Sequence, residues 1–359
     1  MGSKRKKQRR SREALTGSRE KGMSDSSQQK LSRNITKLAA KLFPNVDEQN
    51  IFLHALTHDS SVRTLVWLSP ERQRELGAIF DAKPAPSWVP EYVQIHGDTE
   101  KPGAHALHEE GAYYCLDLSS VFTSVALSIV PKHPSLVIDM CSAPGGKGVL
   151  AWRALSPKRI VLNEVIRKRT AQLIHNVKRC AIKGAEVTSN DPRDIGGAFR
   201  RSAGVVVVDA PCSGQSLLAR DLAAPGAFHP ATISANAQRQ RRILAHSQEC
   251  VKQGGYLLYS TCTFSPEENE ETVEWFLKRF PQFTLCPVSA LQGFQSSLTE
   301  LPCYRLYPHL GVGAGSFCAI FSLTEHATEV NPKDTREDDE RPLLPLRVVF
   351  DSSHPSNSQ

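Results

Sequence analysis

The stretch GVVVVDAPCSG, residues 204–214, is the strongest indicator of fold class in this 359-residue chain. Four consecutive valines without polar alternation predict a strand buried on both faces, as strands are in a parallel sheet covered by helices. Asp209 and Cys212 follow at the carboxyl end of that strand, the edge where ligands and chemistry gather in open α/β sheets. A lone cysteine is more often an inert small hydrophobic residue. Beside Asp209 at such a strand end, Cys212 becomes a candidate for chemistry.

Short apolar runs alternate with helical patterns around this stretch, and the alternation predicts a doubly wound, mostly parallel α/β sheet. A further apolar run, LRVVF at 346–350, is a candidate edge strand. We expect seven strands in the sheet, at residues 135–140, 159–164, 186–191, 204–209, 255–261, 283–288 and 316–323.

The residues before the predicted sheet show different sequence patterns. Residues 24–62 carry apolar residues at helical spacing and predict a small helical region, while the prolines of 84–90 indicate a connector. The segment 111–130 is rich in small and apolar residues and predicts a helix packed on the sheet. We therefore expect a basic tail (1–23), a small N-terminal region with its connector (24–100), a main domain (101–325) and a polar, mobile tail (326–359).

Charge and cysteine usage restrict the class of protein. The net charge is +7, with the basic excess concentrated in residues 1–22, which we expect to be disordered. That tail is either a phosphate-binding or nuclear-targeting segment or a solvated extension. Nine cysteines without a CxxC pair argue against a metal site and for reduced thiols. Neither a span of about 20 apolar residues nor a secretory signal is present, so we expect a soluble intracellular protein that is not secreted.

The first predicted strand runs into a glycine-rich turn, CSAPGGKG at 141–148, followed by a helical pattern. Glycines allow a close backbone approach, and the helix N-terminus offers free N–H groups, so the turn predicts a nucleotide-type cradle. It matches neither the dinucleotide nor the triphosphate motif. The next two strands end in Glu164 and Asp191, which could bind ribose hydroxyls and an adenine amino group. Either acid alone would more often be a helix cap or a turn residue.

The fifth strand leads into a second cysteine motif, YSTCTFSPEENE at 259–270. The fourth and fifth strands can be neighbours in a doubly wound sheet, so Cys212 and Cys262 would face one cleft. Pro266 followed by acids also reads as a helix start, where acids serve as caps and dipole partners. That interpretation accounts for most of Glu267 and Glu271 but leaves Cys262 unexplained.

Taken together, the motifs of this sequence resemble those of a family, the RNA cytosine-5 methyltransferases of the Nop/Sun class. This family includes bacterial ribosomal RNA methyltransferases. The resemblance implies a class I S-adenosylmethionine-dependent methyltransferase fold, Rossmann-like, over residues 105–323. The matching motifs are DMCSAPGGKG (139–148), NEV (163–165), DAPCSG (209–214), QRRIL (240–244), YSTCTFSPEENE (259–270), RLYPH (305–309) and GSFCAIF (315–321).

The resemblance also implies roles for individual residues. Cys262 would add to carbon 6 of cytosine as the nucleophile, and Cys212 would assist product release. Asp209 would bind or protonate the ring at nitrogen 3, and Lys147 would lower a thiol pKa or hold the intermediate. The residues implied in binding S-adenosylmethionine are Cys141, Ser142, Ala143, Pro144, Gly145, Gly146, Lys147, Glu164, Arg169, Asp191 and Asp209.

The expected partner is RNA, with ribosomal RNA favoured over transfer RNA, and the expected protein is a monomer that uses neither metal nor membrane. Family members commonly carry an Arg-x-Asn motif before the catalytic domain; residues 24–100 do not contain it, and SSVRTLVWL at 60–68 is only a faint candidate. The expected compartment is the cytoplasm in a bacterium, or the nucleus or nucleolus in a eukaryote. The alternatives are a DNA cytosine methyltransferase, a non-catalytic RNA-binding assembly factor for ribosomes, and a nicotinamide-dependent oxidoreductase.

Overall fold

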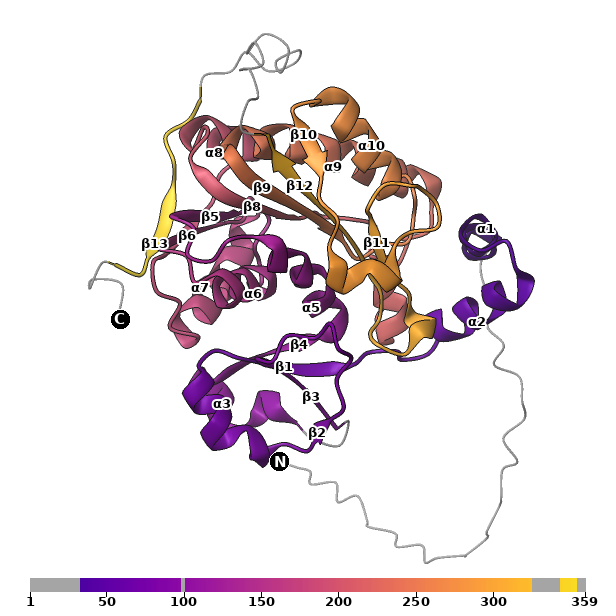
Figure 1. The fold of residues 1–359 in the computed structure, drawn as a ribbon, viewed down its shortest axis with the longest axis horizontal. Coiled ribbons are helices and arrows are strands. Elements are labelled where there is room, and N and C mark those ends of the chain that lie inside the picture. Colours follow the sequence, from indigo (N-terminus) through magenta and orange to yellow (C-terminus); the bar gives the residue numbers. More distant parts are fainter. Residues whose placement is uncertain (1–32, 98–100, 325–342, 354–359) are drawn as a thin grey trace, which may run out of the picture. The chain divides into compact units, whose positions relative to one another are not determined.

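The computed structural model describes residues 33–97, 101–324 and 343–353 (Figure 1). The tail predicted at 1–23 and most of the one predicted at 326–359 lie outside these residues. Within the described ranges, no helix is long and apolar enough to cross a membrane.

A large sheet forms the centre of the fold, and its five middle strands are parallel, as predicted. The remaining strands pair antiparallel at its two sides. The order is β10 (Phe283–Leu285), β12 (Ser316–Leu323), β9 (Val251–Thr261), β8 (Ala203–Asp209), β5 (Leu136–Asp139), β6 (Arg159–Asn163), β7 (Ala185–Thr188) and β13 (Val348–Asp351), with β11 (Tyr304–Leu306) paired to β12.

All seven predicted strands are present in this sheet. The candidate edge strand at 346–350 is also confirmed, as β13 beside β7. The additional strand is β11, whose three residues are too short to show a periodic pattern in the sequence.

Helices cover both faces of the sheet, as Figure 1 shows. One core lies under α5 (Leu118–Val125), α6 (Gly146–Leu155) and α7 (Arg167–Arg179), and the other under α8 (Pro192–Ala198), α9 (Pro230–Cys250) and α10 (Glu270–Arg279). The valines of β8 alternate between them: Val205 and Val207 belong to the first core, and Val206 and Val208 to the second. The run of four valines is therefore apolar because both faces of β8 are buried.

A second, smaller sheet precedes the large one and is antiparallel, with the order β2-β3-β1-β4. Leu65, Trp67 and Tyr113 pack together in its core. The elements of this part are β1 (Arg63–Trp67), α3 (Pro70–Leu76), β2 (Ala82–Lys83), β3 (Val93–His96), α4 (Ala106–Glu109) and β4 (Tyr113–Asp117).

This sheet corrects two predictions. The helix predicted over 111–130 begins only at Leu118, because 113–117 pairs with β1 as β4 and buries its aromatic residues there. The prolines of 84–90 lie between β2 and β3, so this stretch connects two strands of the small sheet. Since β4 pairs with β1, the sheet takes strands from both sides of the boundary predicted at residue 100.

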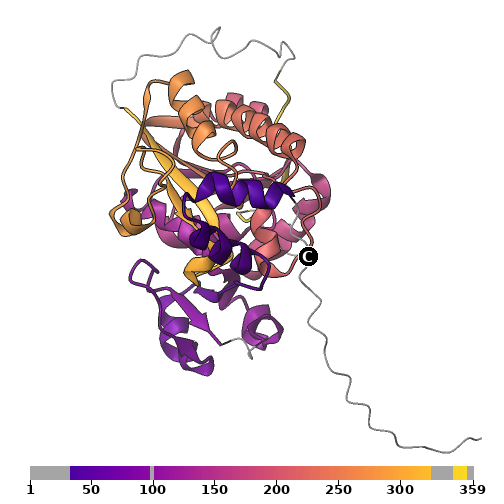
Figure 2. The same cartoon turned by 90° about the vertical axis from the view of Figure 1, so that its right-hand side faces the viewer.

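Two N-terminal helices, α1 (Arg33–Leu42) and α2 (Val46–Leu56), confirm the helical pattern of residues 24–62 and appear in indigo in Figure 2. The Phe52 ring of α2 lies edge-on to Phe264, with 5.3 Å between centroids. Phe264 follows Cys262 by two residues, so these helices pack on the loop that carries this cysteine. Short 3-10 helices are η1 (Gly77–Ile79), η2 (Pro102–Ala104), η3 (Ala126–Ile129), η4 (Gln215–Arg220), η5 (Ser289–Phe294) and η6 (Pro308–Leu310).

Candidate active site

Two cysteines meet at the carboxyl edge of the large sheet. Because β8 and β9 are parallel neighbours, with Asp209 opposite Ser260, the loops that follow them leave from the same edge. The Sγ atoms of Cys212 and Cys262 lie 3.1 Å apart as free thiols. The backbone N–H of Cys262 also points to Cys212 Sγ, at 3.4 Å. The predicted adjacency of these two residues is therefore observed.

The surroundings of the two sulfur atoms differ in charge. A hydrogen bond from the Cys212 thiol lowers the pKa of Cys262, and Lys147 and the Ser216 hydroxyl act in the same direction. The pKa of Cys212 is raised well above its ordinary value by the same hydrogen bond, by burial and by the charge of Glu268. Two thiols this close titrate as a coupled pair. Although the charge of Asp209 opposes it, the direction of the shifts favours loss of the first proton from Cys262, and the thiolate is the nucleophilic form of cysteine.

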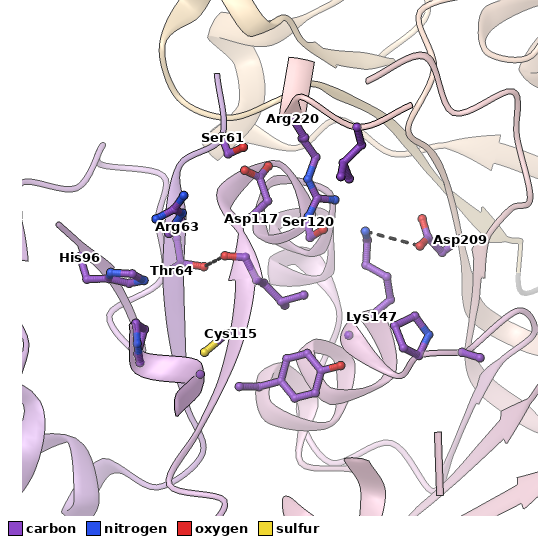
Figure 3. Close-up of a pocket in the computed structure, with 18 of the residues that line it drawn as sticks. Ser61, Arg63, Thr64, His96, Cys115, Asp117, Ser120, Lys147, Asp209 and Arg220 are labelled. Atoms are coloured by element: carbon purple, nitrogen blue, oxygen red, sulfur yellow. Dashed lines mark hydrogen bonds and ion pairs between the residues drawn. The ribbon is translucent and has the colours of Figure 1, made fainter. Parts of the chain in front are cut away.

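A charged pair stands beside the cysteines. Lys147 Nζ, near the start of α6, lies 3.5 Å from Asp209 Oδ2 at the end of β8 (Figure 3). The Ser260 hydroxyl donates to the other carboxylate oxygen of Asp209 at 2.7 Å. The Lys147 side chain is 13% exposed and that of Asp209 35%, so both remain accessible from the cavity that they line.

The glycine-rich turn connects β5 to α6 and contains the predicted residues 141–147. Gly145 has φ +118°, which favours glycine, and a Cβ at Gly146 would lie 2.8 Å from Leu116 Cδ2. Ser142 Oγ and Asp139 Oδ2 are both buried at this turn. Burial raises the pKa of Asp139 to about 7, against the opposing effect of a hydrogen bond from the Ser142 side chain. Ser142, Ala143, Pro144 and Gly146 of the turn border a cavity, so a ligand could be seated on the turn.

Sequence reasoning missed Asp139 as a site residue. The available signal was its position, as an acid at the end of a buried strand directly before the glycine-rich turn. The turn also holds Cys141, whose pKa burial raises well above the ordinary value. Cys141 is thus placed as a neutral thiol in the wall of the turn.

Glu164 and Arg169 form the next part of the cradle. Glu164 is 3% exposed, accepts a hydrogen bond from the backbone N–H of Ile166 at 2.9 Å, and lies 3.0 Å from Arg169 Nη1. Arg169 also donates to the carbonyl oxygen of Ala143. The guanidinium therefore ties the end of β6 to the glycine-rich turn, and both residues fit the predicted cofactor site.

Asp191 has a different setting from the other predicted residues. Its side chain is exposed and accepts from the backbone N–H of Arg193 at 3.0 Å, so it caps α8. The structure shows the capping role, and contact with adenine stays a prediction.

A cavity of about 720 Å³ opens between the glycine-rich turn and the small sheet (Figure 3). Its wall includes Lys147 and Asp209 on one side and Arg63, His96 and Arg220 on others. Cys212 and Cys262 are not among its lining residues, whereas Lys147 and Asp209, whose charges act on the Cys262 thiol, are. Among the described residues, no cluster of three His, Cys, Asp or Glu side chains could hold a metal ion.

The loop of Cys262 is anchored by a buried ion pair that the sequence did not reveal. Arg305 Nε donates to Glu270 Oε1 at 2.6 Å, and a second guanidinium nitrogen pairs with Oε2. Arg305 Nη1 donates to the carbonyl oxygen of Phe264 at 3.0 Å. Glu267 and Glu271, in contrast, pair with Lys41 at the surface.

The sheet order, the glycine-rich turn after the first parallel strand and the acidic strand end beside it define a class I S-adenosylmethionine-dependent methyltransferase fold. The family described as 16S rRNA methyltransferase RsmB/F matches residues 126–322, more than half of the chain, and the chain belongs to this family. This confirms the resemblance found in the motifs. S-adenosylmethionine is the methyl donor of the family, as the resemblance implied.

Individual relatives agree with this assignment. Ribosomal RNA small subunit methyltransferase F from Cronobacter sakazakii is 32% identical over 267 residues, which are 73% of this chain and 55% of that protein. The protein of the same name from Klebsiella pneumoniae is 31% identical over 237 residues, 65% of this chain and 50% of that protein. The chain therefore spans about half the length of the curated relatives it matches.

Solved structures share the fold. NSun6 from Pyrococcus horikoshii with SFG has a TM-score of 0.68 at 18% identity, covering 81% of this chain and 98% of that one. A methyltransferase homolog protein from Pyrococcus horikoshii has a TM-score of 0.62 at 23% identity, covering 81% of this chain and 99% of that one.

Proposed function

We propose that this protein methylates carbon 5 of a cytosine in RNA, with ribosomal RNA of the small subunit as the favoured substrate. The observation that carries the proposal is the 3.1 Å approach of Cys212 Sγ and Cys262 Sγ beside the Lys147–Asp209 pair. Cytosine carbon 5 is a weak nucleophile, so methyl transfer to it requires prior addition of a thiolate at carbon 6. The names of the curated relatives support ribosomal RNA.

S-adenosylmethionine, when bound, supplies the methyl group. The residues proposed to hold it are those of the 141–147 turn, with Glu164 and Arg169 at its side and Asp191 further along the edge. Ser142, Ala143 and Gly146 of the turn line the cavity, which supports a ligand at this place. NSun6 with SFG, an analogue of S-adenosylmethionine, shares the fold of this chain.

The proposed reaction begins with Cys262. Its thiolate forms a bond to carbon 6, and the electron pair of the 5,6 double bond becomes available at carbon 5 for bonding to the methyl group. Cytosine nitrogen 3 is an acceptor, so a protonated Asp209 carboxyl donates the hydrogen bond to it and gives up its proton as the adduct forms, which stabilises the charge that develops on the ring. Lys147, 3.5 Å from Asp209, balances the negative charges of the carboxylate and the thiolate.

The proposed reaction ends with release of the product. A base removes the proton from carbon 5, the carbon–sulfur bond breaks, and the Cys262 thiolate leaves with its electron pair. Cys212, whose Sγ lies 3.1 Å from that of Cys262, assists this departure, and the electron pair of the carbon 5–hydrogen bond re-forms the 5,6 double bond. Because the two thiols are in contact, Cys212 can assist Cys262 without moving first.

The RNA would enter from the cavity next to the small sheet. Arg63, Lys101 and Arg220 line that cavity and offer positive charge to phosphates. The target base must leave its stack to reach Cys262, at a cost of a few kcal/mol that is smallest in loops and single strands.

The test is methylation of purified RNA. The protein is incubated with labelled S-adenosylmethionine and small-subunit ribosomal RNA, transfer RNA or duplex DNA, and the nucleosides are separated by mass spectrometry. We expect 5-methylcytosine in ribosomal RNA, and none with a Cys262→Ala variant that still binds the cofactor in calorimetry. Label in transfer RNA alone would overturn the substrate, and label in no nucleic acid would overturn the proposed activity.

A further inference from the structure

Glu268 is a fully buried carboxylate at the back of the cysteine pair. Its Oε2 atom accepts hydrogen bonds from the backbone N–H of Ser213 at 2.9 Å and from the amide of Gln240 at 2.8 Å. Its Oε1 atom accepts from the Ser213 hydroxyl. Ser213 directly follows Cys212, so the carboxylate fixes the first cysteine loop.

The same carboxylate reaches the second cysteine loop. The hydroxyl of Thr263, which directly follows Cys262, lies 3.4 Å from Glu268 Oε1 and 2.7 Å from Ser213 Oγ. The Tyr259 hydroxyl donates to the backbone carbonyl of Glu268 at 2.6 Å. One side chain therefore touches the residue after each cysteine, while its own backbone is held from β9.

The partners of the Glu268 carboxylate are an amide, a backbone N–H and hydroxyl groups. Burial raises the pKa of the Glu268 carboxyl, while these hydrogen bonds lower it. Both carboxylate oxygens accept hydrogen bonds here, whereas a glutamine of the same shape would place an NH2 donor at one of these positions. The site therefore distinguishes a carboxylate from an amide.

The charges that face the cysteine pair are divided between its two ends. Lys147 from α6 and Asp209 from β8 act on Cys262, and Glu268 acts on Cys212. The neutral phenol of Tyr259 in β9 lies near both Glu268 and Cys212. An anion next to one thiol opposes loss of that thiol's proton.

We propose that Glu268 is a positioning residue that holds the two cysteine loops together and, as an anion on the Cys212 side of the pair, favours the protonated form of Cys212, leaving Cys262 as the nucleophile. This inference rests on the proposed function, because the proposed reaction gives the two thiols different steps. Nothing in the PEENE motif alone separates Glu268 from its neighbours, which pair with Lys41 or Arg305.

The test measures thiol selectivity in the full-length protein without RNA or cofactor. Initial rates of alkylation by iodoacetamide are followed at Cys262 and Cys212 by peptide mass spectrometry between about pH 6 and 9, a range that brackets ordinary thiol titration. The variants are Glu268→Gln, which keeps the shape, and Glu268→Asp, which keeps the charge. Glu267→Gln is the matched control, because Glu267 is 40% exposed and pairs with Lys41 at the surface.

We expect Cys262 to react faster than Cys212 in the wild type and in Glu267→Gln. In Glu268→Gln the ratio of the two rates should fall about tenfold, the effect of lowering the pKa of Cys212 by one unit. An unchanged ratio in folded Glu268→Gln would overturn the role of the charge.

Glu268→Asp tests the clamp, that is, the joining of the two cysteine loops by Glu268. It does so even if the glutamine variant fails to fold. It should keep the preference for Cys262 while it forms a covalent adduct with 5-fluorocytosine RNA several-fold more slowly, because the shorter chain withdraws from Ser213. A wild-type adduct rate in folded Glu268→Asp would contradict the clamp. If the wild type forms no adduct yet shows the expected alkylation ratios, the proposed function fails while the assignment of the proton stands.

Discussion

Replacing Arg305 with methionine should lower the free energy of unfolding by about 3–5 kcal/mol, because the substitution leaves a buried carboxylate without its partner. The side chains of Arg305 and Glu270 are 2% and 3% exposed, so water cannot replace the lost interactions. The guanidinium also holds the carbonyl oxygen of Phe264, which the variant leaves without this donor. The midpoint of thermal unfolding should fall by about 10 °C, since 1 kcal/mol corresponds to about 2–4 °C in domains of 150–250 residues.

The assay is urea and thermal unfolding of Arg305→Met, with two companion variants. Arg305→Met/Glu270→Met removes both charges and should regain most of the lost stability, because apolar replacement of a whole buried pair is often neutral. Lys41→Met breaks a pair whose side chains are 47% and 40% exposed, and should change stability by less than about 1 kcal/mol. A single Arg305 variant within about 1 kcal/mol of wild type, or a double variant no more stable than the single one, would refute the reasoning.

Three further predictions concern the site and its supports. Cys212→Ala should still form the RNA adduct but release product slowly, so that a covalent protein–RNA complex accumulates on denaturing gels; loss of the adduct would reverse the assigned roles. Phe52→Ala should lose about 3–5 kcal/mol in urea unfolding, since its ring is fully buried against Phe264, and a loss below about 1 kcal/mol would contradict that packing. Burial raises the pKa of Asp139 to about 7 from 3.8, so the stability it confers in its protonated form is present at low pH and is lost as pH rises through this window. Between pH 5 and 8 the wild type should therefore lose about 2–3 kcal/mol relative to Asp139→Asn, and equal pH profiles would count against this shift.

The large sheet could be predicted from the sequence because its middle strands are buried on both faces. Each of these strands is an apolar run that needs no knowledge of its partner, as Val205–Val208 illustrates. The local pattern of 111–130 predicts a helix through Tyr113–Asp117, because the pairing of this strand with β1 involves residues about fifty positions away. Segments this short are decided by their tertiary partners more than by local pattern.

The residues of the candidate site also divide into those that a local pattern reveals and those that depend on distant partners. Cys212, Asp209 and Cys262 could be placed together because the carboxyl ends of adjacent parallel strands share an edge. Glu268 and Arg305 could not be found in this way, since their partners come from loops and helices elsewhere in the chain. Their roles depend on burial and hydrogen bonding, and a motif does not display either.

The central claim is that Cys262 attacks carbon 6 of a cytosine in RNA. Its most direct test is incubation of the protein with S-adenosylmethionine and ribosomal RNA containing 5-fluorocytosine, where fluorine blocks removal of the group at carbon 5 and traps the adduct. Peptide mass spectrometry then locates the bond. We expect a methylated 5-fluorocytosine attached to the sulfur of Cys262. Attachment to Cys212, or no attachment by a folded protein that binds the cofactor, would contradict it.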